Sequence, residues 1–144
     1  MRNLLIISDT HRDTSLMEEL IKKYKGYMII HCGDYCVKRD ILDKYDITYV
    51  DGNCDQYDDN IEKVIEIDSK RILITHGHKY RVKMGYMNLY YRAMELMCDY
   101  VFFGHTHEAC VFSDNNITFI NPGSLKYGRT YAVIENDEAI IKEI

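Results

Sequence analysis

The chain has 144 residues, a length that suits one domain (1–144) with a real hydrophobic core. Hydrophobic residues make up 47% and charged residues 28%, which is ordinary for a soluble globular chain. The formal net charge of −5 argues against stable nucleic-acid binding, which favours basic surfaces. It leaves a nucleotide substrate open, because bound cations would reverse the local charge.

The sequence predicts a cytoplasmic protein without a membrane anchor. No apolar run approaches the length of a membrane span, and the N-terminal strand lacks the layout of a signal peptide. Five cysteines, an odd number, favour free thiols in a reducing compartment. Cys32 and Cys36 could form half of a zinc site, but no second pair follows at zinc-finger spacing, so we expect buried thiols instead.

Strands and helices alternate along the first half of the chain. Short apolar runs predict strands, and apolar residues at helical spacing predict helices between them. Thr14 or Ser15 can cap the first helix, with Glu18 and Glu19 in its first turns. The predicted strands are 3–8, 28–31 and 48–50, and the predicted helices are 14–24 and 37–45.

The second half becomes richer in strands. Residues 62–67 alternate and should pair with 71–75 across the turn Asp68-Ser69-Lys70. Residues 85–98 form the longest helical candidate, 100–103 read as a strand, and 110–144 as short strands joined by turns. The order of elements predicts an α/β sandwich of mixed sheets with helices outside. Ligands of open α/β sheets collect beyond the carboxyl ends of the strands.

Five short motifs along the chain supply side chains that can bind metal, and each follows a short apolar run that reads as a strand. Residues that follow neighbouring strands share one edge of a sheet, so these side chains should converge. Seven nitrogen and oxygen ligands suit two divalent cations better than one, which is typical of a dinuclear phosphate-ester hydrolase. The seven candidates are Asp9, His11, Asp34, Asn53, His76, His105 and His107.

The chemistry of these residues matches that assignment. In extended backbone, residues two apart face the same way, so Asp9 and His11 could reach one ion together, and His105 and His107 likewise. Asp34 can bridge two ions because a carboxylate has two oxygens. Imidazole and carboxylate ligands suit Mn, Fe, Zn, Ni or Co, whereas Mg is less natural with four histidines.

Each motif taken alone has an ordinary explanation. Asp34 and Asn53 are common turn residues, and His76 could be a histidine whose hydrogen bonds are satisfied at the edge of the core. The hypothesis rests on their conjunction. Of the six histidines, four occupy ligand positions and His78 lies two residues from one, while only His31, inside an apolar strand, looks structural.

The motif order Asp-X-His, Gly-Asp, Gly-Asn, His-Gly-His and Gly-His-X-His resembles the calcineurin-like metallophosphoesterases. The short length, Gly52-Asn53-Cys54-Asp55 and Ile120-Asn121-Pro122-Gly123-Ser124 resemble the small bacterial and archaeal phosphodiesterases of the YfcE type. The match runs from Ser8 to Ser124. It implies a four-layer αββα sandwich of two mixed β-sheets flanked by helices, with the site on loops at one end.

The resemblance also implies two divalent metal ions, with Mn favoured and Fe, Zn, Ni or Co as alternatives. A hydroxide between the ions would attack phosphorus in line, opposite the leaving alkoxide. The catalytic residues would include Asp34, Asn53, His76 and His78. The first ion would be held by Asp9, His11, Asp34 and His107, and the second by Asp34, Asn53, His76 and His105.

Cys54 marks a departure from many phosphatases of the superfamily, which have His after the ligand Asn. A thiol is a poorer general acid for an alkoxide than imidazolium, so the sequence favours phosphodiesters over monoesters with poor leaving groups. Cys54 could be a covalent nucleophile, but a buried or metal-adjacent thiol is the favoured interpretation. The expected substrate contacts are Asn53, His78, Arg12 and Cys54, and Tyr35 also borders a ligand.

Other roles stay open. His78 could contact substrate or orient a ligand, and Asp13, Asp55 and Glu108 could accept an N–H from a ligand histidine or be solvated loop residues. The methionines and tyrosines of 85–98 fit core packing better than a partner groove. The 13 tyrosines could support a homo-oligomer interface.

The expected partner is a small phosphate-ester substrate such as a nucleotide, with no membrane partner. The main alternative is a protein-binding scaffold with the same fold, like the retromer subunit Vps29. A scaffold predicts eroded ligands, and here all seven positions hold competent side chains. A metal-dependent regulatory or storage protein is a third interpretation.

Overall fold

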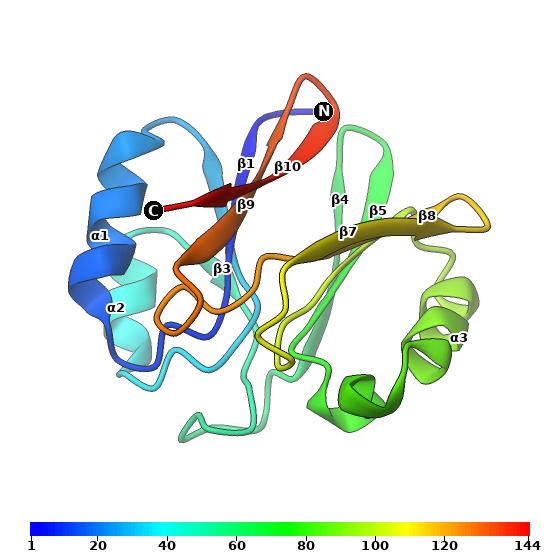
Figure 1. Cartoon of the computed structure of the whole chain (residues 1–144), viewed down its shortest axis with the longest axis horizontal. Coiled ribbons are helices and arrows are strands. Elements are labelled where there is room, and N and C mark those ends of the chain that lie inside the picture. The colour runs from blue at the N-terminus through cyan, green and yellow to red at the C-terminus, as the bar shows by residue number, and fades with distance from the viewer.

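The structure is a computed structural model that describes residues 1–144. Two five-stranded sheets pack face to face and helices cover their outer faces, which gives the predicted four-layer αββα sandwich (Figure 1). The first sheet has the order β10-β9-β1-β2-β3 and the second β4-β5-β6-β8-β7. No helix is long and apolar enough to cross a membrane.

The strands of the first sheet are β1 (Leu4–Ile7), β2 (Met28–His31), β3 (Thr48–Tyr49), β9 (Thr130–Glu135) and β10 (Glu138–Glu143). Those of the second are β4 (Glu62–Ile67), β5 (Lys70–Thr75), β6 (Tyr100–Phe102), β7 (Cys110–Asp114) and β8 (Ile117–Asn121). β1, β2 and β3 run parallel to one another, as do β5, β6 and β8. Each sheet therefore presents several carboxyl ends at one edge.

β1 is apolar on both faces because both faces are covered. Leu5 and Ile7 pack into the cluster beneath the helices, whereas Leu4 and Ile6 pack into the cluster between the sheets. This period of two is the alternation of side chains along a strand. A strand buried on both sides reads as a continuous apolar run, which is why the sequence indicated it clearly.

The predicted hairpin of 62–67 is confirmed, although its second strand begins at Lys70 instead of Arg71. Asp68 and Ser69 form the turn with φ of 49° and 72°. Positive φ at both central residues is the geometry of the tight turn that matches the twist of paired strands.

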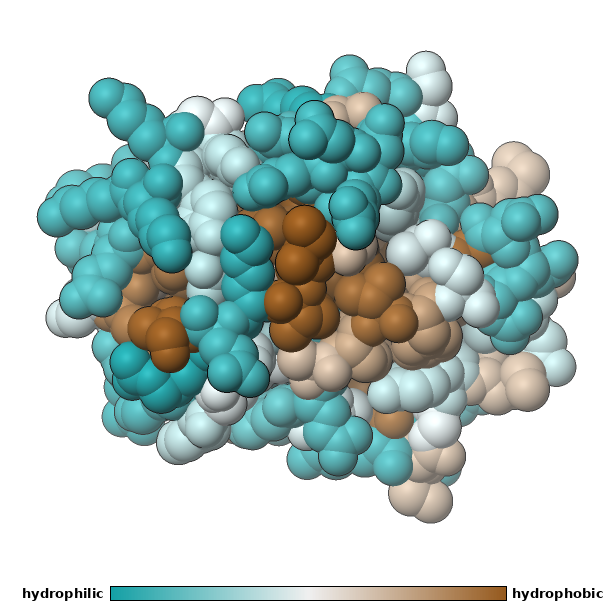
Figure 2. All heavy atoms as spheres, turned by 45° about the horizontal axis from the view of Figure 1, so that its top comes forward, coloured by the Kyte–Doolittle hydropathy of each residue, from teal (hydrophilic) through white to brown (hydrophobic).

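The end of the molecule that carries the N-terminus is mostly polar, with an apolar strip between the polar side chains (Figure 2).

The helix α1 (Thr14–Lys23) agrees with the prediction except for its cap. The side chain of Asp13 accepts a hydrogen bond from the backbone N–H of Leu16, at 3.2 Å, so the expected cap at Thr14 or Ser15 is wrong. Asp, Thr and Ser are all good N-cap residues, and here they follow one another. The path of the loop before the helix therefore decides which of them is the N-cap. No acidic residue lies in the first turn, so Glu18 and Glu19 fall later than expected.

The other helices are shorter than predicted. α2 spans Arg39–Lys44, and α3 spans Met87–Glu95 after two 3₁₀ turns, η1 (His78–Tyr80) and η2 (Val82–Met84). Within α3 only Leu89 and Ala93 are buried, so the predicted packing of its methionines and tyrosines is largely wrong. The exposed large residues of this region are Met84, Met87, Tyr91, Met94 and Met97.

Candidate metal centre

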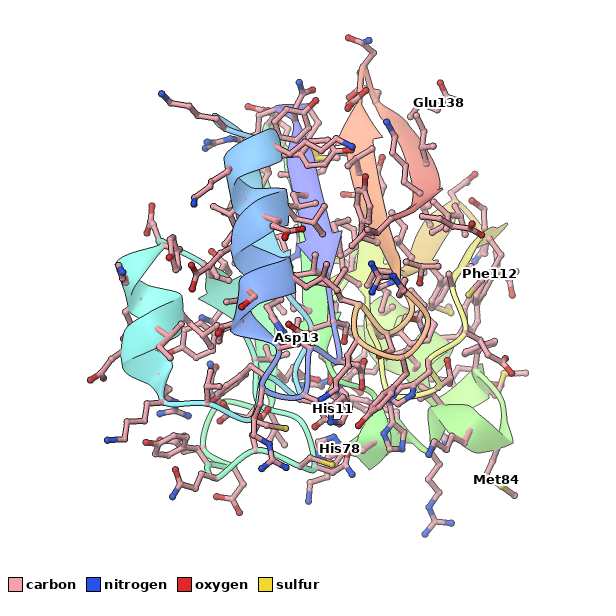
Figure 3. All side chains as sticks on the ribbon, turned by 60° about the vertical axis from the view of Figure 1, so that its left-hand side comes forward. His11, Asp13, His78, Met84, Phe112 and Glu138 are labelled. Carbon is pink, nitrogen blue, oxygen red and sulfur yellow. The ribbon has the colours of Figure 1, made fainter.

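Predicted ligands from both sheets meet at one end of the sandwich. Asp9 and His11 follow β1, Asp34 follows β2, His76 follows β5, and His105 and His107 follow β6. In Figure 3 the labels of His11 and His78 mark that end, with Met84 and Phe112 to one side of it. Parallel strands therefore bring together residues that are almost one hundred positions apart in the sequence.

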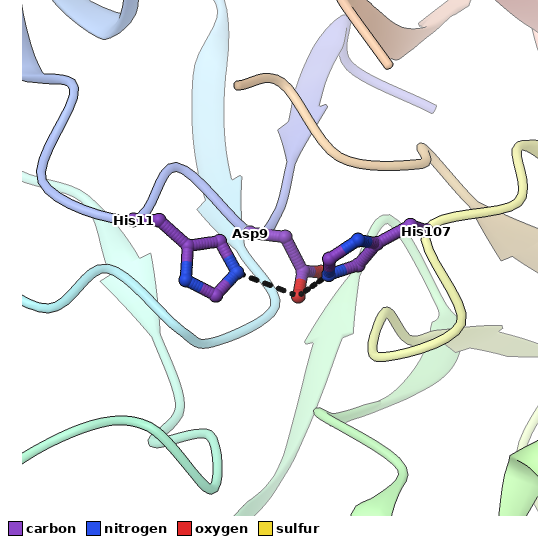
Figure 4. Close-up of side chains that lie close together, drawn as sticks. All are labelled: Asp9, His11 and His107. Carbon is purple, nitrogen blue, oxygen red and sulfur yellow. Dashed lines mark hydrogen bonds and ion pairs between the residues drawn. The ribbon is translucent and has the colours of Figure 1, made fainter. Parts of the chain in front are cut away.

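Asp9 lies between two histidines (Figure 4). The Nε2 atom of His107 is 3.1 Å from Asp9 Oδ1, and the Nε2 atom of His11 is 3.6 Å from the same oxygen. Asp9 is fully buried, and the hydroxyl of Ser8 donates to its other oxygen at 2.5 Å. Asp9, His11 and His107 together offer three ligand atoms within 4.8 Å of one another.

Asp34 lies between His11 and His76 in the same way. Its Oδ2 atom is 3.2 Å from His76 Nε2 and 3.7 Å from His11 Nε2. Asp9, Asp34 and His76 form a second group of three ligand atoms within 4.8 Å. The two groups share Asp9, so the carboxylates and imidazoles form one continuous cluster.

His105 and His78 flank His76. The His105 ring is 5.1 Å from the His76 ring, and its backbone N–H donates to Asp9 Oδ2 at 3.2 Å. The His78 ring lies 5.5 Å from that of His76. Asn53 is exposed, and its amide donates to the Cys54 thiol at 3.6 Å rather than to the cluster.

The donor set fits a divalent cation. The Nε2 atoms of His11 and His76 and the Nδ1 atom of His78 are buried without a hydrogen-bond partner. Buried polar atoms are rarely left unpaired, and those of His11 and His76 lie within 4 Å of the Asp9 and Asp34 carboxylates. The other nitrogen of His76, Nδ1, lies 2.8 Å from the carbonyl oxygen of Cys32, which is how proteins commonly orient a metal-binding histidine.

The pKa shifts of Asp34 and His105 suit metal binding, whereas the raised pKa of His76 favours an imidazolium that must lose its proton to bind a cation. Burial acts to raise the pKa of Asp34, but the His76 imidazole, whose Nε2 atom is 3.2 Å away, outweighs burial and holds that pKa well below its usual range. Burial and the charge of His76 lower the pKa of His105 to about 4. For His76, burial acts to lower the pKa. Asp34 and Asp9 act to raise it and have the larger effect, so the pKa of His76 lies above its usual value.

Two glycines let the loops approach the carboxylates. A Cβ added to Gly52 would lie 2.1 Å from Asp34 Oδ1, and one added to Gly104 would lie 2.1 Å from Ser8 Oγ and 2.6 Å from Asp9 Oδ2. Atoms at such distances overlap. These positions therefore require glycine because of close packing against the cluster.

The backbone is strained at five of the predicted ligands. Their φ angles are positive, a region that non-glycine residues visit at a cost, although Asp and His tolerate it better than most. The angles are 54° for Asp9, 41° for His11, 59° for Asp34, 71° for His105 and 63° for His107. Such outliers gathered at one place are typical of functional sites.

Asp55 has a larger structural role than the sequence indicated. Its carboxylate accepts from the backbone N–H groups of Asp34 at 2.8 Å, Gly52 at 2.7 Å and Cys36 at 2.7 Å. It therefore ties the two loops that carry Asp34 and Asn53 together. Asp13 caps α1 and Glu108 is exposed, and neither carboxylate accepts a hydrogen bond from a predicted ligand.

The segment 120–124 contributed to the family resemblance without an assigned role, and two of its residues hold the backbone beside the cluster. The Ser124 hydroxyl donates to the Asp9 carbonyl oxygen at 2.8 Å, and the Asn121 amide donates to the Gly104 carbonyl oxygen at 3.2 Å. Both belong to the Asn121-Pro122-Gly123-Ser124 segment. A polar run directly after an apolar strand was the available signal.

His31 is structural, as predicted. Its ring is fully buried, its Nε2 atom lies 2.9 Å from the Thr10 hydroxyl, and the Gly33 N–H donates to Nδ1 at 3.1 Å. Burial lowers its pKa to about 3, so the ring is neutral at ordinary pH.

The cysteines only partly match the expectation of buried thiols. All five are free; Cys32 is buried, Cys36 is half-buried and Cys54 is exposed. The Cys54 sulfur belongs with His11 and Asp34 to a third group of ligand atoms within 4.8 Å. Burial and the Asp34 charge raise the pKa of Cys54, so its thiol stays protonated at neutral pH.

A polar cavity of about 440 Å³ adjoins the cluster, and His11, Arg12, Lys38 and Cys54 are among its lining residues. Arg12 thus lies where a phosphate could approach. A larger cavity of about 620 Å³ lies away from the cluster, between η2, the start of α3 and Phe112. That cavity is apolar and holds no predicted ligand, so we assign the chemistry to the smaller one. Tyr35, by contrast, is buried and donates to Asp51 at 2.6 Å, so it lines no pocket.

Residues 1–139 match the calcineurin-like phosphoesterase superfamily domain. The chain belongs to this family of metallophosphoesterases, and membership implies divalent metal ions. A probable metallophosphoesterase of Bacillus subtilis, YsnB, is 36% identical over 152 residues, covering 97% of this chain and 89% of that protein.

Solved structures share the fold. A predicted phosphoesterase from Streptococcus pneumoniae superposes with a TM-score of 0.89 at 28% identity, covering 99% of this chain and 89% of that one. An archaeal phosphodiesterase has a TM-score of 0.79 at 22% identity, covering 99% of both chains. Vps29 of Entamoeba histolytica, solved with zinc, has a TM-score of 0.76 at 20% identity, and the match covers 99% of this chain and 98% of that one.

Proposed function

We propose that residues 1–144 form a single metallophosphoesterase domain that hydrolyses a phosphodiester with the help of two divalent ions, Mn being the favoured ion. The observation that carries this proposal is the cluster of two buried carboxylates and several imidazoles, some with unpaired buried nitrogens. In the proposed division, Asp34 contributes to both ions. Asp9, His11 and His107 complete one set, and Asn53, His76 and His105 complete the other.

The bound ions would supply a hydroxide nucleophile near neutral pH and neutralise charge on the phosphoryl oxygens. The chain's own residues hold the geometry. Cys32 fixes the His76 ring through its carbonyl oxygen, and Ser8 fixes the Asp9 carboxylate. Preorganised groups of this kind cost no rearrangement during the reaction.

Substrate contacts are proposed for Arg12, Asn53, Cys54 and His78. Arg12 and Cys54 line the polar cavity beside the cluster, and Arg12 brings a positive charge suited to a phosphate oxygen. Burial lowers the pKa of His78, so its ring is largely neutral at pH 7 and has one N–H to donate.

A phosphodiester is favoured over a monoester because Cys54 stands where a histidine acid would help an alkoxide leave. A thiol with a raised pKa is a weak proton donor and carries little thiolate at neutral pH. Because the thiolate is the nucleophilic form, a covalent role for Cys54 is disfavoured as well. Activated diesters, whose leaving groups need no proton, should be the best model substrates.

The test is hydrolysis of bis-p-nitrophenyl phosphate by metal-stripped protein, with and without added Mn²⁺, beside p-nitrophenyl phosphate as the monoester. We expect Mn²⁺-dependent turnover that prefers the diester and disappears in His105→Ala. Absence of turnover with Mn, Fe, Zn, Ni and Co would overturn the enzymatic proposal.

In that case the Vps29-like scaffold would become the leading candidate. It ranks second because each predicted ligand position holds a side chain able to bind metal.

We further propose a cytoplasmic location, supported by five free thiols, and a small phosphate ester as the partner.

A further inference from the structure

An exposed aromatic side chain stands directly beside the cluster. The Tyr127 ring lies 5.1 Å from the ring of His11 and is stacked with the ring of His107, with centroids 5.7 Å apart and planes 21° apart. Tyr127 is nevertheless 63% exposed. A tyrosine that served only to pack against the histidines would gain more by being covered, as Tyr35 and Tyr131 are at 1% exposure.

The loop that carries Tyr127 is fixed to the cluster. The Tyr127 backbone N–H donates to the Ser124 hydroxyl at 2.9 Å, and that hydroxyl donates to the Asp9 carbonyl oxygen at 2.8 Å. Gly128 closes the turn by donating to the Ser124 carbonyl oxygen at 2.9 Å. Two hydrogen bonds in series therefore hold the ring at a set place relative to Asp9.

A positive charge accompanies the ring. The Lys126 ammonium donates to the His11 carbonyl oxygen at 3.3 Å and lies 5.6 Å from the centre of the Tyr127 ring. Exposed aromatic side chains beside cationic ones are the surfaces on which bases stack in proteins that hold nucleotide chains. Stacking needs only a flat π-face on the ligand, and so it selects aromatic groups without selecting a particular base.

We propose that Tyr127 is the subsite for a flat aromatic substituent of the phosphodiester, such as a nucleobase, and that Lys126 supports it with charge. The proposal rests on the proposed phosphodiesterase function and names its substrate class. It makes Tyr127 a specificity-determining residue that acts on the part of the substrate away from phosphorus.

Binding of two products tests the proposal without turnover. Thymidine 5′-monophosphate and methyl phosphate carry the same phosphate, and only the first has a base. We expect Mn²⁺-loaded protein to bind the nucleotide more tightly in calorimetry. Tyr127→Ala should weaken nucleotide binding about tenfold, the order that loss of one stacked base gives, and leave methyl phosphate within about twofold. Tyr127→Phe, which keeps the ring, should behave as the parent does.

Tyr91→Ala is the matched control, because Tyr91 is 58% exposed on α3 and its ring neighbours only that of Tyr90, at a tilt of 55°. It should leave both affinities unchanged. An equal loss for both ligands in Tyr127→Ala would show that the ring merely supports the histidines and would overturn the proposal. So would an unchanged nucleotide affinity, or a parent protein that does not distinguish the two ligands.

Kinetics with two diesters separates the proposed role of Tyr127 from the proposed phosphodiesterase function. Thymidine 5′-p-nitrophenyl phosphate and methyl p-nitrophenyl phosphate release the same phenolate and differ in the retained group. Tyr127→Ala should raise KM for the first and leave kcat and the second substrate nearly unchanged. If the parent hydrolyses neither diester, the phosphodiesterase proposal fails, while the calorimetric comparison still decides the role of Tyr127.

Discussion

The Nδ1 atom of His76 lies 2.8 Å from the carbonyl oxygen of Cys32, and this contact joins the two sheets of the sandwich. Cys32 follows β2 in the first sheet, and His76 follows β5 in the second. The His76 side chain is fully buried, so it contributes to packing as well as to the candidate site.

His76→Ala should therefore abolish metal-dependent hydrolysis and also destabilise the fold. The Cys32 carbonyl would lose its partner in a buried place, at a cost of about 1–3 kcal/mol. His105→Ala is the control, because the His105 ring makes no hydrogen bond and the residue is only half-buried, so its loss should change stability by less than about 1 kcal/mol. Urea denaturation of both variants checks this, and equal midpoints would contradict the structural role of His76.

Gly52→Ala should lower activity although it removes no polar group. The new methyl group would collide with Asp34 Oδ1 at 2.1 Å and with the Asp34 backbone nitrogen at 2.6 Å, so the carboxylate must move. A displacement of this size near reacting groups can cost about a hundredfold in rate. Gly26→Ala meets no atom within 4 Å and should lose only stability, through its φ of +92°. Rates with bis-p-nitrophenyl phosphate compare the two.

Asp55→Asn should weaken activity by about 10- to 100-fold, as loss of groups that orient metal ligands commonly does. The carboxylate accepts three backbone N–H groups, and an amide can accept on its oxygen only. The loops of Asp34 and Asn53 would then lose part of their connection. Metal affinity, measured by competition with a chelator, should fall in parallel, and an unchanged affinity would remove Asp55 from this role.

Cys54→Ala should retain hydrolysis within about threefold, because its thiol is protonated at neutral pH and therefore not the reactive form. Turnover of an activated diester at pH 7 measures this directly. Complete loss of activity in the alanine variant, with metal content unchanged, would establish a chemical role for the thiol.

Glu62 gives a pH-dependent contribution to stability. Burial raises the pKa of Glu62, but hydrogen bonds from Arg92 and Tyr80 outweigh burial and hold this pKa below its usual value. The contribution is therefore complete above about pH 4.3, the usual pKa of a free glutamate, and fades as pH falls through the lower folded value. Glu62→Gln should destabilise the protein by roughly 1–2 kcal/mol at pH 7.

The gap between Glu62→Gln and the parent should shrink as the pH falls from 7 to 3, because the parent loses the contribution of the Glu62 charge below the usual pKa of glutamate. Glu95→Gln is the control, because the Glu95 side chain is 68% exposed although Arg92 also contacts it. Denaturant midpoints at pH 7 and pH 3 measure both variants. A gap of equal size at the two pH values would mean that the Glu62 charge is not involved.

The strand positions and the convergence of the ligand motifs could be predicted because each rests on a local pattern. Leu4 to Ile7 form a continuous apolar run, and polar residues after such runs must gather at the carboxyl edge of a parallel sheet. The contact of Tyr127 with His11 could not be predicted, because it depends on the return of a loop more than one hundred residues later in the sequence.

The limits of local patterns also explain the errors in the helices. Asp13, Thr14 and Ser15 can each cap a helix, so composition does not choose among them. The methionines of α3 sit at helical spacing, but spacing alone does not reveal how much of a helix its neighbours cover. The role of Asp55 could not be predicted because two of its three donors, Asp34 and Cys36, belong to a loop about twenty residues earlier in the sequence.

The positive φ angles at Asp9, His11, Asp34, His105 and His107 have an evolutionary consequence. Glycine or asparagine would relieve strain at each of these positions, whereas the proposed hydrolysis needs the present side chains. Stability and activity thus select different residues here. A lineage released from the need for hydrolysis would drift toward glycine at these turns and keep the sandwich intact, leaving an inert and sturdier fold free for other uses.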